Sequence, residues 1–521
     1  MCYMNSEKEH AMSMIEKNRS SAIIKNTLSN YSRQAVQILV FLALTPFIAD
    51  KLGTEAFGLW ALLQAVIGLF GLLDLGFGTS VVKFVAGARS SEDTTLISTL
   101  TATFFWVYML LGAIVIVAAS AFVIVLPSVL NIPDAYVGAS QMVFLLVAFR
   151  TALGMPLGMF LGVMTGFQRQ WWANSFKIAS TLLYAGGTFW ALLASPSIQW
   201  LGVVNLVSNT IAMAFGAWIC VTRLPGVSVN PKFFRLHMVR EISSFSLFIF
   251  IIQVSSLIYT RIDSLIVQSV LSLSAVALYS VASRIAEEAS GMCRQLTNAL
   301  TPVVAELHGS GDKQNIRAVL LLGTKLSTAL AVPLLLGLFF LVEPLLVVWM
   351  GEEFRLATSA TQILLATMLI SVIHGNGANV LSMTGHQRYL AGVFFGGQML
   401  NLTLTLILIR LYGLMGVALA TLISSAVVDM GLVQPRANRS TGISFVRFYS
   451  SSVMPSVIPV LIMYGSLLGI VRIYPPTSLV AIALIEAFAC LVFFGSFLLF
   501  GLKKDERSYI IDKVRNIRKR G

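Results

Sequence analysis

Apolar residues occur along this chain in long runs separated by short polar segments. A helix that crosses a membrane needs about 20 consecutive apolar residues, whereas the strands of an outer-membrane barrel alternate apolar and polar residues over about 10. The pattern therefore predicts an all-α polytopic membrane protein with fourteen transmembrane helices. We expect them at about residues 33–50, 56–78, 99–126, 138–164, 172–194, 199–221, 243–267, 275–304, 317–342, 357–383, 389–409, 413–434, 451–471 and 478–501.

Composition supports the same class of protein. Of the 521 residues, 57% are hydrophobic and 11% are charged, against about 25% charged residues in soluble domains. This balance excludes a soluble enzyme, a DNA-binding module and a secreted disulfide scaffold. The four cysteines are scattered without a C-x-x-C pair, so buried thiols are expected rather than disulfides or metal ligands. The first 30 residues contain no apolar segment typical of a signal peptide.

The positive charge is distributed unevenly between the two predicted sides of the membrane. The formal net charge is +13, with 36 Lys and Arg residues. On the fourteen-helix map, 28 of the 36 lie on the side shared by both tails, four lie on the opposite side, and four lie inside spans. Because cytoplasmic loops are enriched in Lys and Arg, both termini are predicted to be cytoplasmic. The basic balance then requires no nucleic-acid partner.

A short internal repeat predicts two related bundles. The sequence Met164–Arg169 (MTGFQR) returns 219 residues later as Met383–Arg388 (MTGHQR). Two six-helix lobes inserted with the same orientation would be parallel repeats. In transporters built from such repeats, the substrate path lies between the two lobes. The predicted organisation is a cytoplasmic tail 1–30, an N-lobe 31–222, a cytoplasmic loop 223–242, a C-lobe 243–434, an extra helical hairpin 451–501 and a basic tail 502–521.

The eighth predicted span carries most of the intramembrane charge. At 100° per residue, one arc of about 120° holds its strongly polar side chains, which include Arg284, Glu287, Glu288 and Arg294. Charges inside a bilayer are costly and rarely face lipid, so this face is predicted to line a polar interior. An alternative remains open, in which Arg284 pairs with Glu287 or Glu288 and only holds the bundle together.

Other spans contain isolated polar residues. Arg261 and Asp263 in the seventh span point to different sides, and Arg150 lies in the fourth span. Asp74, in the second span, is surrounded by glycines. Glycines allow neighbouring helices to pack closely, so this segment is consistent with either a packing role or a transport role. His374 is expected to be packed and hydrogen-bonded.

Several motifs resemble those of polysaccharide flippases (Wzx-type), which belong to the multidrug/oligosaccharidyl-lipid/polysaccharide exporter superfamily. The resemblance extends over about residues 26–502. Each motif is loose, but their order together with the fourteen-span plan is specific. The motifs are Leu52–Trp60 (LGTEAFGLW), Asp74–Gly78 (DLGFG), the Arg261–Asp263 tract, Ala277–Ala282 (ALYSVA) and Gly413–Ala420 (GLMGVALA).

The resemblance implies a MATE-like fold with two six-helix lobes in a V. It implies a transporter of the bacterial cytoplasmic membrane that flips a polyprenyl-pyrophosphate-linked oligosaccharide by ion-coupled alternating access. The implied partners are this lipid-linked substrate, a proton or sodium ion, membrane lipids, and a polysaccharide polymerase or other assembly proteins. The candidate substrate-binding residues are Arg150, Arg261, Arg284 and Arg294. The candidate ion-coupling residues are Asp263, Glu287 and Glu288.

Two other functions remain as alternatives. A multidrug or cation antiporter of the same superfamily would need an acidic, aromatic-rich lobe, and here each lobe contains Arg. A membrane polysaccharide polymerase or ligase would need a large extracytoplasmic loop, and the longest one on this map has about fourteen residues. No catalytic residue, cofactor or metal site is predicted.

Overall fold

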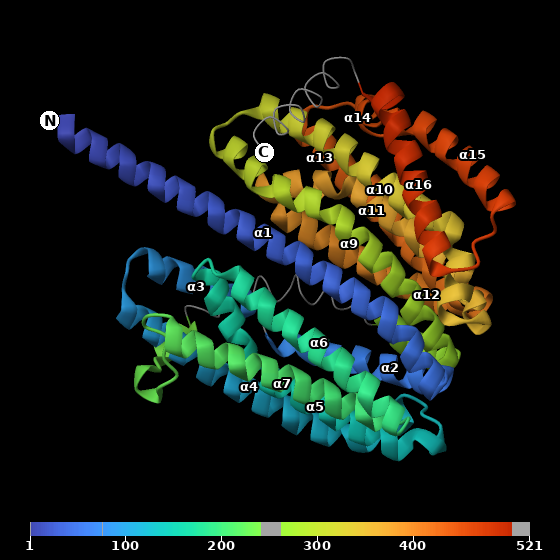
Figure 1. Cartoon of the computed structure of the whole chain (residues 1–521), viewed down its shortest axis with the longest axis horizontal. Coiled ribbons are helices and arrows are strands. Elements are labelled where there is room, and N and C mark those ends of the chain that lie inside the picture. Colours follow the sequence, from blue (N-terminus) through green and yellow to red (C-terminus); the bar gives the residue numbers. More distant parts are fainter. Residues whose placement is uncertain (1, 75–76, 241–261, 503–521) are drawn as a thin grey trace. The chain divides into compact units, whose positions relative to one another are not determined.

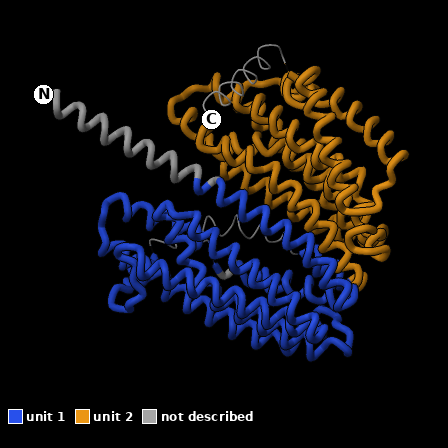
Figure 2. Tube along the Cα trace, viewed as in Figure 1, with its two compact units in different colours: residues 1–269 blue, residues 270–521 orange. Residues whose placement is uncertain are grey.

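The computed structural model describes residues 2–74, 77–240 and 262–502, and every regular element in these ranges is a helix. The prediction of an all-α protein is confirmed. The chain forms two compact units, residues 1–269 and 270–521 (Figure 2). The predicted lobe boundary at residues 223–242 stays a prediction, because most of the seventh predicted span, 243–267, lies outside the described residues.

Unit 1 is a bundle in which α5 packs against α4 on one side and α7 on the other, while α6 packs against α1 and α7 (Figure 1). Its helices are α1 (Cys2–Leu52), α2 (Thr54–Phe70), η1 (Gly71–Asp74), α3 (Phe77–Ser90), α4 (Thr94–Val129), η2 (Asp134–Tyr136), α5 (Val137–Gly166), α6 (Gln170–Ala194), α7 (Ile198–Arg223) and η3 (Pro231–Phe233).

Unit 2 is built around α11, which packs against α9, α10 and α12. The hairpin of α15 and α16 is attached mainly through α16, which packs against α10. Its elements are α9 (Leu273–Gly309), α10 (Lys313–Met350), η4 (Glu352–Ala357), α11 (Thr358–Met383), α12 (Gln387–Ser425), η5 (Ala426–Val433), α13 (Gln434–Thr441), α14 (Phe445–Ser452), η6 (Met454–Ser456), α15 (Val457–Ile473), α16 (Leu479–Ser496) and η7 (Phe497–Gly501).

Ten helices in the described ranges are long and apolar enough to cross a membrane. One of them, residues 387–441, contains two predicted spans and is broken at Gly413, whose φ is +57°. Many large apolar side chains on the outer faces are exposed, among them Ile124 (75%) and Trp190 (71%), and such surfaces require an apolar environment. The protein is a multi-pass membrane protein, and the number fourteen stays a prediction.

The second predicted span differs from the structure. A single helix was expected over residues 56–78, but α2 ends at Phe70, a 3₁₀ turn covers Gly71–Asp74, and α3 continues from Phe77 to Ser90. The physical reason is local. Three glycines lie between residues 71 and 78, and glycine is a poor helix former. The Asp74 carboxylate accepts a backbone hydrogen bond from Gly78 across the break.

The two copies of the internal repeat occupy equivalent positions in the chain. Each copy ends one long helix and begins the next, α5 to α6 in unit 1 and α11 to α12 in unit 2. A residue in the left-handed conformation lies in each turn, but at different positions of the repeat: the fifth, Gln168 (φ +59°), in the first copy and the third, Gly385 (φ +85°), in the second. The left-handed conformation is common at helix C-termini, so the repeat encodes a helix connection.

Candidate functional site

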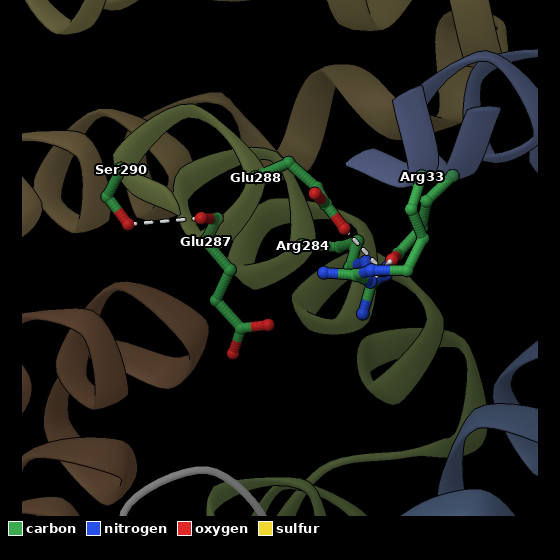
Figure 3. Close-up of polar contacts among 6 residues, drawn as sticks. Arg33, Arg284, Glu287, Glu288 and Ser290 are labelled. Carbon is green, nitrogen blue, oxygen red and sulfur yellow. Dashed lines mark hydrogen bonds and ion pairs between the residues drawn. The ribbon is translucent and has the colours of Figure 1, made fainter. Parts of the chain in front are cut away.

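The polar face of α9, which contains the eighth predicted span, carries charged side chains of both signs. Arg284 and Glu288, one helical turn apart, form an ion pair of 2.6 Å between Nη2 and Oε1 (Figure 3). The Glu288 side chain is 12% exposed and that of Arg284 is 39% exposed. The pairing that sequence analysis left open as a scaffold role is therefore present.

The same face continues toward the C-terminal end of α9. Arg294 is exposed, and its guanidinium donates a hydrogen bond of 2.8 Å to the hydroxyl of Ser290. Ser290 in turn donates to the backbone carbonyl of Glu287, as Figure 3 shows. Within the described ranges Arg294 has no carboxylate partner. Arg294 therefore presents a less neutralised cation than Arg284.

The apolar face of α9 is buried in part. The helical period predicts Ile285, Ala289, Met292, Leu296 and Leu300 on this face, and Leu296 and Leu300 are only half-buried. Ile285, Ala289 and Cys293 are buried against the rest of unit 2, at 7%, 6% and 0% exposure. Met292, which was expected on the same apolar face, is 50% exposed. Charged and amide side chains cover a half-exposed face while small and apolar residues pack inward, as expected of an amphipathic helix.

The remaining candidate residues lie in unit 1 or outside the described residues. Arg261 belongs to the latter group. Asp263 is 7% exposed. Arg150, on α5, is half-buried and lies within electrostatic range of Tyr184 on α6. The ion pair within α9 is the one contact between candidate residues that the described structure establishes.

Unit 1 contains a polar site that sequence analysis did not assign to substrate or ion. Asp74 lies at the break between α2 and α3, and its carboxylate accepts hydrogen bonds from the Tyr108 hydroxyl at 2.6 Å and from the Gly78 backbone at 3.3 Å. A cavity of about 300 Å³ adjoins it. The cavity is lined by Gly71, Asp74, Gly78, Tyr108, Thr151, Gly154, Met155, Gly158, Met159 and Gly162.

Glycines of α5 have two roles around this cavity. A Cβ atom on Gly162 would lie 3.0 Å from a methyl group of Val81, so this glycine allows α3 to pack closely. A Cβ atom on Gly158 would meet nothing within 4 Å, so this glycine leaves space open. The regular spacing of glycines along the fourth predicted span was the sequence signal for this cavity. The hydrogen-bond partner of Asp74 could not be found from a local pattern, because Tyr108 lies 34 residues away.

His374 is packed and hydrogen-bonded, as expected. Its Nδ1 lies 2.7 Å from the carbonyl oxygen of Ile370, and its Nε2 lies 2.9 Å from the hydroxyl of Tyr449 on α14. In the described parts of the chain, no three His, Cys, Asp or Glu side chains gather in an arrangement that could hold a metal ion.

Two family models match this chain. The family model described as polysaccharide biosynthesis protein matches residues 23–308, more than half of the chain, and the MatE model matches residues 248–407. A probable low-salt glycan biosynthesis flippase of Haloferax volcanii, Agl15, is 23% identical over 462 residues, which are 87% of this chain and 91% of the relative. A putative O-antigen transporter of Shigella flexneri is 21% identical and covers 77% of this chain and 94% of its own length.

Solved structures share the fold. An inward-facing multidrug resistance MATE transporter of the MOP superfamily superposes with a TM-score of 0.70 at 14% identity, covering 78% of this chain and 94% of its own. The lipid II flippase MurJ, in an inward closed conformation, has a TM-score of 0.68 at 15% identity and covers 91% and 98%. The chain therefore has the fold of the MATE transporters and of MurJ, and it belongs to the polysaccharide biosynthesis protein family.

Proposed function

We propose that this protein flips a polyprenyl-pyrophosphate-linked oligosaccharide from the inner to the outer leaflet of the bacterial cytoplasmic membrane. The observation that carries the proposal is the match of the polysaccharide biosynthesis family over residues 23–308. The exported glycan would then be used by a polysaccharide polymerase or other assembly proteins.

The chemistry of the substrate explains the need for intramembrane Arg residues. A pyrophosphate-linked glycan has a large hydrophilic, anionic head, so its path must supply cations and exclude lipid. Guanidinium groups remain charged and contact phosphate oxygens through paired donors. In this proposal Arg294, with Arg150, Arg261 and Arg284, contacts the pyrophosphate during alternating access.

Coupling to a proton or sodium gradient is assigned to the carboxylates Asp263, Glu287 and Glu288. Replacement by the amide keeps the size of each side chain and removes its charge. We expect at least one of Asp263→Asn, Glu287→Gln and Glu288→Gln to abolish gradient-driven transport at normal protein abundance. Normal transport in all three variants would exclude these residues as the ion site.

The second candidate is a multidrug or cation antiporter. The MatE model matches residues 248–407, and the MATE transporter structures share the fold of this chain. A strain without the protein distinguishes the two. The flippase proposal predicts loss of surface glycan, accumulation of the lipid-linked oligosaccharide on the cytoplasmic face, and unchanged accumulation of cationic dyes. Increased dye accumulation with normal surface glycan would contradict it.

The proposed direction of export requires the orientation that the Lys and Arg distribution predicts. A single cysteine at Ser310, between α9 and α10, is expected to be shielded from a membrane-impermeant thiol reagent in intact cells. A single cysteine at Glu353, in η4, is expected to react. The reverse labelling pattern would contradict the assignment of both termini to the cytoplasm.

A further inference from the structure

The helical hairpin of α15 and α16 contains a carboxyl group that the proposed transport mechanism does not use. Glu486 is the eighth residue of α16, which packs against α10 and α15 (Figure 1). The segment Leu479–Gly501, to which it belongs, is long and apolar enough to cross a membrane. Ionisable residues are costly within membrane spans and mark functional sites when they occur there.

The carboxyl group of Glu486 points at the backbone of α10. A Cβ atom on Gly337 would lie 2.7 Å from the carboxyl carbon of Glu486. The missing side chain of this glycine therefore provides the space that the carboxyl group fills. The group lies in the contact between α16 and α10 and not on the outer surface of the hairpin.

The surroundings of this carboxyl group are apolar. Glu486 follows Ile485, which belongs to a hydrophobic cluster that joins α16 to α10 and α15. Both carboxyl oxygens of Glu486 are enclosed, and within the described residues neither has a hydrogen-bond partner. A charged carboxylate in such a position loses its hydration without any compensation, so the neutral, protonated form is strongly favoured.

No charged side chain in the described ranges pairs with Glu486. Cys490, one turn further along α16, lies within electrostatic range of Glu486 and of Cys293 on α9. Arg294, which follows Cys293, is exposed and donates its hydrogen bond to Ser290 within α9. The other ionisable residues on the two helices that pack against α16 are Lys313, Arg317, Lys325, Glu343, Tyr464 and Arg472. None of them bonds to Glu486, since both of its oxygens lack a partner.

Position along the helices explains why these cations do not reach the carboxyl group. Lys325 lies twelve residues before Gly337 on α10, which is about 18 Å along the helix axis. Leu502 lies sixteen residues after Glu486, which is about 20 Å along α16 and η7. Glu486 therefore lies in the apolar middle part of the hairpin.

We infer that Glu486 is a proton-binding site, and that its carboxyl group carries a proton while α16 is packed against α10. Release of the proton would leave a negative charge beside the thiol of Cys490, in a position closed to water. Ionised Glu486 therefore requires α16 to move away from α10, so proton binding and packing of the hairpin stabilise each other. The site is separate from Asp263, Glu287 and Glu288, and it does not depend on the proposed substrate.

Infrared spectroscopy of the full-length purified protein in detergent tests the protonation state directly. A protonated carboxyl group and a carboxylate have separate carbonyl stretching bands. At neutral pH we expect a protonated-carboxyl band in the wild-type protein that is smaller in Glu486→Gln. Glu343→Gln is the matched control, because the Glu343 side chain on α10 is 55% exposed and lies 3.5 Å from Arg355. Glu343 is therefore ionised, and its variant should keep the whole band.

The effect of pH on stability has a definite sign. In the unfolded chain Glu486 meets water and is ionised at neutral pH, whereas the folded protein retains the proton. The melting temperature of the wild-type protein should therefore fall as the pH rises from about 6 to about 9. Glu486→Gln resembles the protonated form in size and charge, so we expect it to reduce this fall by several degrees. Glu343→Gln should not reduce it.

Two results would overturn the inference. A protonated-carboxyl band of equal size in wild-type protein and in Glu486→Gln would show that Glu486 is ionised in the folded protein. An equal dependence of the melting temperature on pH in both proteins would show that no proton is linked to packing of the hairpin. If Glu486→Gln folds poorly, Glu486→Met, which is apolar and of similar volume, replaces it in both measurements.

Discussion

The cavity beside Asp74 and the polar face of α9 are both polar regions among apolar helices, but they are built in opposite ways. In unit 1 the helix is interrupted, and a single carboxylate is held by a tyrosine hydroxyl and a backbone amide. In unit 2 the helix is continuous, and charges of both signs stand along one face. The first site is defined by backbone geometry and the second by charge density, so substitutions should act differently at the two sites.

The largest effect is expected at Arg294 on α9. Arg294→Ala removes a cation without a carboxylate partner in the described structure, and we expect export of surface glycan to fall about tenfold or more at normal abundance. Arg294→Lys should rescue only partly, because Lys lacks the paired donors of guanidinium. Arg410→Ala, an exposed cation on α12, is the control. A fall in abundance that parallels the fall in export would make Arg294 a scaffold residue.

The ion pair of α9 provides the second test. Arg284→Gln removes the ion pair of the Glu288 carboxylate, which is 12% exposed, and breaking the ion pair of a largely buried charge is costly. We expect membrane abundance on immunoblots to fall several-fold, and the double variant Arg284→Gln/Glu288→Gln to restore much of it. Normal abundance of the single variant would contradict a structural role for this ion pair.

Unit 1 should be sensitive to helix spacing. A Cβ atom on Gly112 of α4 would lie 2.6 Å from the backbone oxygen of Ala152 on α5. Gly112→Ala is therefore expected to destabilise the protein by about 1–3 kcal/mol, seen as a lower melting temperature in detergent. Gly158→Ala, where the space is open, is the matched control and should not lower it. Equal melting temperatures for the two variants would contradict the packing role.

The smallest effect is expected at Tyr108. Tyr108→Phe removes one hydrogen bond to Asp74 and should lower the free energy of unfolding by about 1 kcal/mol. Asp74→Asn retains an acceptor oxygen but loses the charge, and we expect it to lower the free energy of unfolding by a similar amount. Both changes are measured through the melting temperature in detergent. If either variant lost glycan export without a change in melting temperature, a purely structural role for the Asp74–Tyr108 pair would be contradicted. Both the Asp74 site and the polar face of α9 would then act in transport.

These two sites also show what the sequence could reveal. The α9 face was predictable because 3.6-residue periodicity places Arg284, Glu288 and Arg294 together from local spacing alone. The Asp74 site was not, because its partner Tyr108 comes from another helix and the helix α2 ends at Phe70 within an otherwise apolar run.

Reconstitution tests the central claim most directly. Purified protein is placed in liposomes with a fluorescent polyprenyl-pyrophosphate-linked oligosaccharide, and an impermeant glycosidase measures how much glycan reaches the other leaflet under a proton or sodium gradient. Our account predicts gradient-dependent translocation by the wild-type protein and loss of translocation in Arg294→Ala. Absence of translocation under both gradients, together with gradient-driven movement of a cationic dye, would contradict it and identify the protein as an antiporter.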